Sequence, residues 1–179
     1  MVRIFAAIDI PEPIKRRLHA VSQSARKACP SASFVREENL HVTLVFLGEM
    51  SNGEIDAMRK RLASVGCGQF EITVGGLGFF PSESLPRVFW AGASSPELGG
   101  LHAKICDSLG VEPEKDFIGH VTLGRMRDAQ SAAGLVGFAQ NLPSPSFGSF
   151  TADSFSLKQS ALTPRGAQYL DLARFSLRQ

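Results

Sequence analysis

The chain has 179 residues, of which 44% are hydrophobic and 20% are charged. These proportions are typical of a globular protein, and they exclude a collagen, a coiled coil and a wholly disordered chain. The 19 basic and 17 acidic side chains leave a formal net charge of +2. This charge is too small to hold a long nucleic acid by itself, but it allows a local basic pocket for a phosphate.

The sequence indicates a cytoplasmic protein with no membrane partner. No stretch approaches the ~18 apolar residues of a membrane helix. Asp9 and Pro11 interrupt the N-terminal apolar run before it reaches the length of a signal segment. The three cysteines, Cys29, Cys67 and Cys106, are an odd number without a C-x-x-C pair. A disulfide framework is therefore not expected, and a reducing compartment fits the chain better.

Hydrophobic periodicity predicts strands and helices along the chain. Apolar or alternating runs predict strands, and apolar residues three or four positions apart predict helices. The predicted strands are residues 2–10, 39–47, 70–74, 88–91, 117–123, 154–159 and 167–177. The predicted helices are residues 11–28, 54–65, 96–109 and 131–139. Segments rich in Gly, Ser and Pro predict a loop or hairpin at 75–86, a loop at 142–149 and a turn at 163–166.

This order of elements predicts the α+β class. Strands and helices are mixed, and the connections in the last third of the chain are short. Both features favour a mostly antiparallel sheet over a doubly wound parallel one. No linker divides the sequence, so residues 1–179 are predicted to form a single domain.

One tetrapeptide occurs twice and carries most of the functional information. The sequence His-Val-Thr-Leu begins at His41 and again at His120, although the chain has only 4 histidines. Each copy lies at the end of an apolar, strand-like run, and the two copies are separated by close to half of the chain. The repeat predicts two related halves about a pseudo-two-fold axis.

Strand alternation predicts where these side chains point. Residues i and i+2 share one face of a strand, so His41 and Thr43 point away from the core. His120 and Thr122 do the same in the second copy, while the valine and leucine of each copy face the core. If the two strands meet at the axis, one groove receives two imidazoles and two hydroxyls.

Two imidazoles in one groove suit an in-line displacement at phosphorus. The unperturbed imidazole pKa is near 6.5, so one neutral ring can take a proton from the attacking hydroxyl while a charged ring protonates the leaving oxygen. The hydroxyls of Thr43 and Thr122 can bind the phosphate oxygens, and Arg125 adds positive charge there. This chemistry requires no metal ion or other cofactor, and the sequence offers no carboxylate cluster to hold a metal.

A structural role and metal ligation are the alternatives to catalysis for these histidines. A lone histidine in a strand is usually structural, so the second identical copy is what favours a catalytic role. Metal ligation by His41 and His120 is disfavoured, because no Cys, Asp or Glu stands two or four residues beyond either of them. His19 and His102 lie in predicted helices without a matching threonine and are interpreted as surface or helix-packing residues.

These residues resemble the signatures of a known family. Residues 39–49 and 120–125 are similar to the two H-x-[ST] motifs of the 2H phosphoesterases, and residues 3–11 and 87–92 are similar to their opening and middle strands. Within that superfamily the chain resembles the 2′-5′ RNA ligase-like proteins, also described as RNA 2′,3′-cyclic phosphodiesterases. Gly119 stands where the family often has Pro.

The resemblance implies a bilobal α+β fold of two interleaved lobes, with two mostly antiparallel sheets flanked by helices and a central groove. It implies hydrolysis of an RNA 2′,3′-cyclic phosphate to a 2′-phosphate, and the related reversible joining of RNA ends by a 2′-5′ linkage. By motif position, His41 would be the general acid on the 3′-oxygen and His120 the general base on water. Sequence alone does not order these two roles. Thr43, Thr122 and Arg125 would bind the phosphate.

The remaining candidates are less specific. Phe46 is placed by strand alternation on the face of His41 and could stack on a base, although a core role fits it equally well. Arg36 and Lys158 are weaker candidates for contacts with the RNA backbone, and a solvated surface position is their alternative. The expected partners are RNA ends or small cyclic nucleotides. A monomer is expected because the pseudo-symmetry is already internal.

Two other functions stay open. The chain could be an RNA-end-binding module that keeps the groove without turnover. It could also be a phosphodiesterase that acts on 2′-5′-linked oligonucleotides or small cyclic nucleotides.

Overall fold

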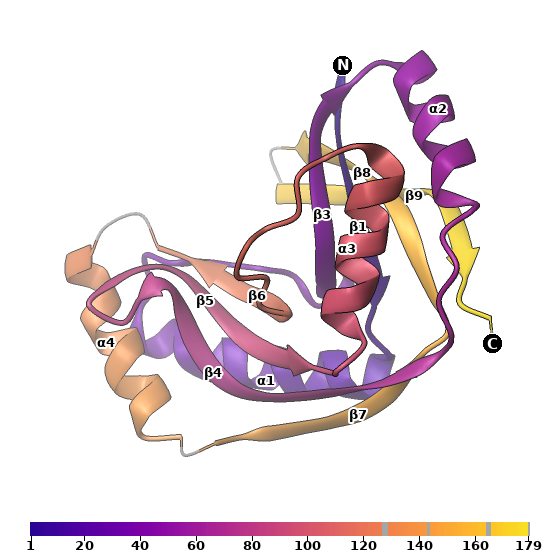
Figure 1. Ribbon diagram of the computed structural model, residues 1–179. Helices are drawn as coiled ribbons and strands as arrows, with labels where there is room; N and C mark the ends of the chain where they lie inside the picture. Colours follow the sequence, from indigo (N-terminus) through magenta and orange to yellow (C-terminus); the bar gives the residue numbers. More distant parts are fainter. Residues whose placement is uncertain (127–128, 143, 164–165, 179) are drawn as a thin grey trace.

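A computed structural model describes residues 1–126, 129–142, 144–163 and 166–178 (Figure 1). The helices are α1 (Glu12–Ala28), α2 (Asn52–Leu62), α3 (Leu98–Leu109) and α4 (Ala129–Gln140), with a short 3₁₀ helix η1 (Glu37–Asn39). The strands are β1 (Val2–Asp9), β2 (Ser33–Phe34), β3 (His41–Met50), β4 (Phe70–Ser82), β5 (Leu85–Ser94), β6 (His120–Arg125), β7 (Ser146–Ala152), β8 (Ser154–Thr163) and β9 (Gly166–Ser176). Within these ranges no helix is both long and apolar enough to cross a bilayer.

The strands form one antiparallel sheet in the order β7-β4-β5-β6-β3-β1-β8-β9, with β2 paired to β6. The predicted α+β class with antiparallel pairing is confirmed. The two predicted sheets are joined into one, because the two copies of the tetrapeptide lie side by side on β3 and β6. That joint consists of a single residue pair, Val42 with Val121. We call β6-β5-β4-β7 the β6 half and β3-β1-β8-β9 the β3 half.

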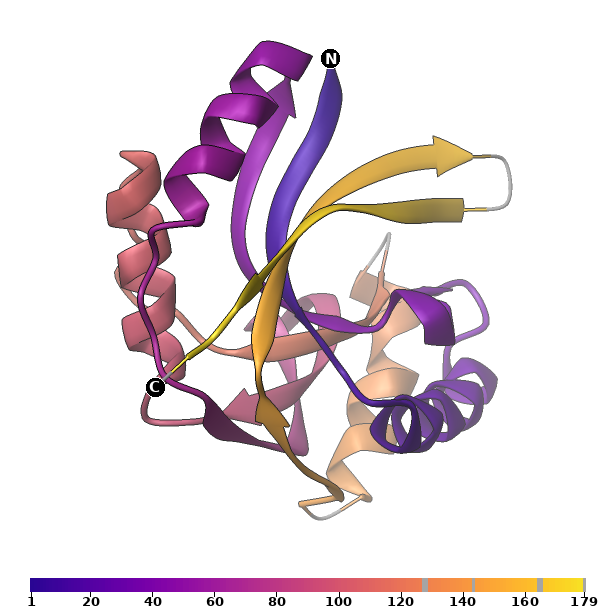
Figure 2. The same ribbon diagram turned by 90° about the vertical axis from the view of Figure 1, so that its right-hand side faces the viewer.

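Helices are exchanged between the two halves. Helix α1 follows β1 of the β3 half, but it packs against β6 and β7 of the β6 half. Helix α3 follows β5 of the β6 half, but it packs against β3. Figures 1 and 2 show α1 and α4 on one side of the molecule and α2 and α3 on the other. The chain therefore crosses repeatedly between the halves that meet at the joint.

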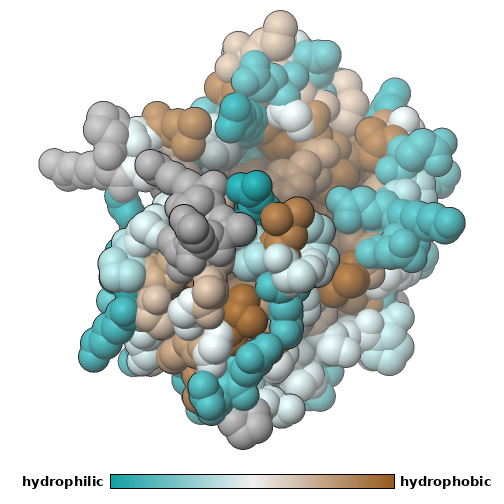
Figure 3. Space-filling view, turned by 90° about the vertical axis from the view of Figure 1, so that its left-hand side faces the viewer, coloured by the Kyte–Doolittle hydropathy of each residue, from teal (hydrophilic) through white to brown (hydrophobic). Residues whose placement is uncertain are grey.

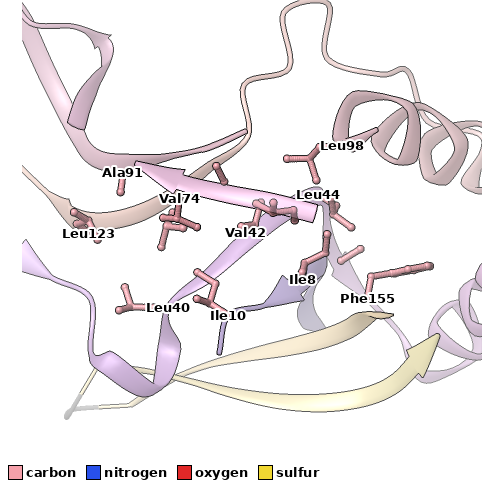
Figure 4. Packing of buried hydrophobic residues seen from close by; sticks show 14 of the residues in the cluster. Ile8, Ile10, Leu40, Val42, Leu44, Val74, Ala91, Leu98, Leu123 and Phe155 are labelled. Atoms are coloured by element: carbon pink, nitrogen blue, oxygen red, sulfur yellow. The ribbon is translucent and has the colours of Figure 1, made fainter. Parts of the chain in front are cut away.

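The joint is part of the hydrophobic core. The side chains of Val42, Val121 and Leu123 are fully buried, and Ile8 is 1% exposed. Figure 4 shows Val42 among side chains from both halves, including Ile8 and Val74. Burial of a valine side chain stabilises a fold by about 1.5–3 kcal/mol, so apolar packing holds the halves together where only one residue pair joins the strands.

The segment 75–86, predicted as a loop or hairpin, is a hairpin, because β4 and β5 continue through it up to a turn at Glu83-Ser84. A Cβ at Gly78 would overlap the ring of Trp90, which lies across that position. Glycine is needed there for close packing. The predicted loop 142–149 is wrong in its second part, because β7 begins at Ser146 and pairs with β4. The middle of the predicted turn 163–166 lies outside the described residues.

Candidate active site

The valine pair at the joint determines how the two histidines are arranged. Val42 and Val121 face the core, and the neighbouring His41 and His120 are partly exposed on the opposite face, as alternation predicts. Because β3 and β6 are antiparallel, the histidines lie on opposite sides of the valine pair along the strands. The space-filling view in Figure 3 shows a recess on one side of the molecule, with hydrophobic residues set below a hydrophilic rim.

Each copy of the tetrapeptide contains a β-bulge at the same position. The pairing of β3 with β1 skips Leu44, and the pairing of β6 with β5 skips Leu123. Both are the fourth residue of the tetrapeptide. An extra residue shifts the alternation of a strand by one position. The side chains directly beyond the bulge therefore point to the face opposite to the one that simple alternation gives.

The bulges bring Phe46 and Arg125 to the face of the histidines. Both residues stand five positions after a histidine, so uninterrupted alternation would place them on the opposite face. The alternation argument for Phe46 was therefore wrong, and the bulge is what brings the ring to the face of His41. The Phe46 side chain is 65% exposed, which makes the core alternative wrong. Its ring lies 6.1 Å from Phe5, which contacts His41 at 5.0 Å between ring centroids.

Hydrogen bonds fix the tautomer of His41. Its Nδ1 lies 2.7 Å from the carbonyl oxygen of Asn39. A carbonyl only accepts, so Nδ1 carries the hydrogen and Nε2 of the neutral ring has a free electron pair. The Thr43 hydroxyl, 3.0 Å away, then donates to Nε2. The reactive nitrogen is therefore Nε2, and it shares the threonine hydroxyl of its own tetrapeptide.

His120 has the same arrangement. Its Nδ1 donates to the carbonyl oxygen of Ile118 at 2.8 Å, so Nε2 again has the electron pair in the neutral ring. In both copies the acceptor carbonyl belongs to the residue two positions before the histidine. Sequence reasoning missed both carbonyls, although alignment of the two copies could have indicated them as a shared feature.

Aromatic rings surround each imidazole. His41 lies between Phe5 and Tyr169, whose ring meets it edge-on at 5.3 Å. His120 lies near Phe80, edge-on at 4.9 Å, and Trp90 at 6.2 Å. These apolar walls hold the rings in place and remove water from them. Sequence analysis had not assigned these aromatic neighbours, because they come from strands distant in the sequence.

An ion cluster lies beside His41. The Lys158 ammonium is buried and binds the carboxylates of Asp9 at 2.8 Å and Asp171 at 2.5 Å. Burial alone lowers the pKa of Lys158, but the bonds to Asp171 and Asp9 raise it overall. The predicted surface alternative for Lys158 is therefore wrong. The three residues, together with His41 and Tyr169, line a pocket of about 480 Å³.

Arg36 differs from Lys158. It forms an exposed ion pair with Glu38 at 3.4 Å, which agrees with the solvated alternative.

The environment of His41 disfavours its charged form. Burial, with the nearby positive charge of Lys158, lowers the pKa of His41 to about 4, although the bond to Asn39 and the charge of Asp9 oppose this shift. Burial also lowers the pKa of His120, with a further contribution from Arg125 and opposition from Ile118 and Glu114. Both rings are therefore neutral at pH 7 until an anion joins them.

Arg125 places positive charge at the same site. Its side chain is exposed. Burial lowers the pKa of His120 and the charge of Arg125 adds to that shift, whereas burial raises the pKa of Tyr169, in the β3 half, and the charge of Arg125 opposes that shift. One guanidinium thus acts on groups of both halves. Thr122, two residues after His120, is partly exposed like Thr43.

The backbone before His120 is held firmly despite its glycine. The Gly119 carbonyl accepts the Ala93 amide at 2.9 Å. A Cβ at Gly119 would overlap the Ala93 carbonyl oxygen and the side chain of Leu98. Close packing therefore restricts this position and leaves no room for a larger residue.

The residues that the structure describes contain no group of three or more His, Cys, Asp or Glu side chains that could hold a metal ion. The ionisable side chains nearest to His41 are already engaged in the Lys158 cluster. The structure thus has two imidazoles near enough for the charge of His120 to act on His41, with partly exposed hydroxyls and an exposed guanidinium on the same two strands. Groups of these kinds are the ones that phosphoryl-ester chemistry uses.

Comparison with known proteins agrees with this arrangement. Residues 8–90 match the family model for LigT-like phosphoesterases. An RNA 2′,3′-cyclic phosphodiesterase of Archaeoglobus fulgidus is 35% identical over 97% of this chain and 99% of its own length. The protein of the same name from Methanothermobacter thermautotrophicus is 33% identical over 98% and 99%. The crystal structure of E. coli LigT complexed with 3′-AMP has a TM-score of 0.79 at 25% identity and covers 99% of both chains.

The fold and these relatives define a phosphoesterase of the two-histidine type. The chain belongs to the family of LigT-like phosphoesterases, within the 2H phosphoesterase superfamily. The family predicted from the two tetrapeptides is confirmed.

The tautomers and pKa values of the two rings can be measured directly. We expect long-range ¹H–¹⁵N spectra at pH 7 to show the Nδ1–H tautomer for both His41 and His120. In a pH titration the His41 signals should move with a midpoint near pH 4, because burial and Lys158 oppose its protonation. A His41 midpoint at or above pH 6.5, or an Nε2–H tautomer, would contradict the described environment.

Proposed function

We propose that this protein hydrolyses RNA 2′,3′-cyclic phosphate ends to 2′-phosphates, with His41 and His120 as the proton carriers and without a metal ion. The observation that carries the proposal is that two imidazoles with equivalent tautomers lie on opposite sides of one valine pair. The names of the archaeal relatives and the 3′-AMP bound to E. coli LigT support a nucleotide substrate of this kind.

The reaction is an in-line exchange of oxygen atoms at phosphorus. The base removes a proton from water, and the water oxygen forms a bond to phosphorus. The bond from phosphorus to the 3′-oxygen breaks on the opposite side, and the acid gives its proton to that oxygen. The 2′-ester bond remains, so the product is a 2′-phosphate. After the reaction the base carries one proton more than before and the acid one proton fewer. Proton exchange with solvent then restores both rings.

His41 is proposed as the acid and His120 as the base. The negative charge of a bound phosphate favours the charged form of His41, so Nε2 takes a proton from solvent when the substrate binds. Burial and Lys158 disfavour that charged form, so the proton is readily given up to the leaving oxygen. The neighbouring Thr43 hydroxyl, which donates to Nε2 in the free protein, can turn to a phosphate oxygen when that nitrogen becomes protonated.

Arg125 and the two threonines are proposed to bind the phosphate. The guanidinium acts electrostatically on both halves and can stabilise the charge that develops on the phosphate oxygens. Thr43 and Thr122 offer hydroxyls on the same face. These groups hold the anion between the imidazoles, and its negative charge offsets the desolvation that keeps both rings neutral in the free protein.

Phe46 is proposed to stack on the base next to the cyclic phosphate. The bulge at Leu44 presents its ring on the face of His41, largely exposed and beside Phe5. Exposed aromatic rings near a phosphate-binding group are typical of single-stranded RNA sites, in which stacking is tolerant of sequence. The substrate class is therefore an RNA end that still carries a base.

The same geometry accepts a 5′-hydroxyl in place of water, which would join two RNA ends by a 2′-5′ linkage. We propose hydrolysis as the main reaction because water is always present at the recess. We also propose a monomer, since both histidines come from one chain, and a cytoplasmic location, which the three free cysteine thiols support.

The central test is hydrolysis of an oligonucleotide that ends in a 2′,3′-cyclic phosphate, in the presence of excess EDTA. We expect a 2′-phosphate product and undiminished activity in the chelator. His41→Ala and His120→Ala should each lower kcat by about 100-fold or more, which is the usual contribution of a general acid or base. Product analysis separates a 2′-phosphate from a 3′-phosphate and from a ligated product.

The control is His19→Ala, which removes a histidine of α1 that bonds to Gln23 and should leave kcat unchanged. Activity lost in EDTA and restored by a divalent metal would refute metal independence. Binding of the oligonucleotide with no product would support the RNA-end-binding module instead, and turnover of small cyclic nucleotides alone would support the metabolite alternative.

Substitution of the two residues presented by the bulges, Arg125 and Phe46, should affect different kinetic constants. Arg125→Ala should lower kcat by about 100-fold, because the developing charge loses its guanidinium partner. Phe46→Ala should raise KM about tenfold with kcat within twofold, because stacking of a base contributes about 1–3 kcal/mol. A substrate that carries the cyclic phosphate on an abasic ribose should show no effect of Phe46→Ala. Equal KM values for Phe46→Ala and the parent on the normal substrate would contradict the stacking role.

A further inference from the structure

A third histidine connects the two copies of the tetrapeptide from the opposite side of the sheet. His102, on α3, is 3% exposed. Its Nδ1 lies 2.8 Å from the carbonyl oxygen of Leu44, and its Nε2 lies 3.1 Å from the backbone nitrogen of Glu114. The carbonyl accepts and the amide donates, so Nδ1 carries the hydrogen and Nε2 accepts. Both ring nitrogens are engaged, which makes His102 more than the helix-packing residue that the sequence indicated.

The hydrogen bond from His102 Nδ1 is accepted at the β-bulge of β3. Leu44 is the extra residue on β3, and its carbonyl lies beyond the last pair that β3 forms with β6. The equivalent carbonyl of Leu123 accepts the backbone amide of Val35 at 2.8 Å, directly after β2, which pairs with β6. In the β6 half a short strand supplies the donor to the bulge. In the β3 half the imidazole of His102 supplies it.

The hydrogen bond to His102 Nε2 comes from the segment 110–119, which connects α3 to β6, the strand of His120. Glu114 and Phe117 both lie between α3 and β6. The Phe117 ring stacks on the His102 ring at 4.2 Å with an interplanar angle of 10°. The same segment ends at Ile118, whose carbonyl orients His120. One imidazole therefore contacts the bulge that follows His41 and the segment that precedes His120.

We propose that His102 is a positioning residue that holds the Leu44 bulge and the segment 110–119 in register, and so aligns His41 with His120 for proton transfer. His102 does not touch the recess and transfers no proton. This role rests on the proposed function in so far as alignment is measured by turnover, but the position of the His41 ring can be measured without any substrate. A displacement of about 1 Å at a reacting group can lower a rate by about 100-fold.

Three substitutions separate the two bonds. His102→Asn places an amide nitrogen near the position of Nδ1 and keeps the donor to Leu44. His102→Gln places an amide oxygen near the position of Nε2 and keeps the acceptor for Glu114. His102→Phe preserves an aromatic ring against Phe117 but removes both bonds. We expect kcat to fall about tenfold or more in His102→Phe, with KM within twofold, and to fall less in His102→Asn and in His102→Gln, each of which keeps one of the two bonds.

Ile105→Ala is the matched control. Ile105 is a fully buried residue of the same helix, and its side chain takes part in neither of the two hydrogen bonds of His102. It should lower the thermal midpoint while kcat stays within twofold at a temperature where each variant is folded. A purely structural role for His102 would make kcat follow the thermal midpoint equally in both variants, and this result would overturn the proposal.

Imidazole NMR of the substrate-free protein supplies the readout that is independent of activity. The ring signals of His41 should shift in His102→Phe and return toward the parent positions in His102→Asn. Unchanged His41 signals together with an unchanged kcat in His102→Phe would overturn the positioning role. If the parent protein showed no hydrolysis at all, the proposed function would fail, while the NMR comparison would still decide whether His102 positions His41.

Discussion

The contact between Val42 and Val121 is the constraint on which the site depends. It is the only residue pair that joins β3 to β6 in the described sheet, and both side chains are fully buried. An antiparallel pair necessarily places the preceding residues on opposite sides, and both of these residues are histidines. Two proton carriers on opposite sides of a small recess are what an in-line displacement requires. The same packing that stabilises the core therefore also determines where the two histidines lie relative to each other.

The equivalent bulges at Leu44 and Leu123 present different residues, so the two similar halves form an asymmetric site. The bulge at the fourth residue of each tetrapeptide presents the residue after next on the side of the histidines. In the β6 half this residue is Arg125, an exposed cation that we propose to bind the phosphate. In the β3 half it is Phe46, an exposed ring that we propose to stack on a base. In this proposal, equivalent backbone geometry presents one group for each chemical part of a nucleotide, and the Lys158 cluster adds a further difference beside His41.

The sequence predicted the features that depend on local periodicity. Strand alternation placed His41 and Thr43 on one face, and helical spacing located α1 and α3 within a few residues. The bulges could not be predicted from a period of two, because an extra residue is visible only in the pairing with the neighbouring strand. Around Gly78 the sequence left a loop and a hairpin open, because a glycine that makes room for Trp90 in a strand has the same local pattern as a glycine in a loop. The partners of Lys158 and His102 come from other elements, so no local pattern indicated them.

The most direct measurement is a crystal structure with a nucleoside 2′,3′-cyclic vanadate, which reproduces a five-coordinate phosphorus. The account predicts vanadium in the recess between the two tetrapeptides, with Nε2 of His41 at hydrogen-bond distance from one apical oxygen and Nε2 of His120 at hydrogen-bond distance from the opposite one. Vanadium bound elsewhere, or both imidazoles on the same apical oxygen, would contradict the claim that the valine joint places one proton carrier on each side of the reacting atom.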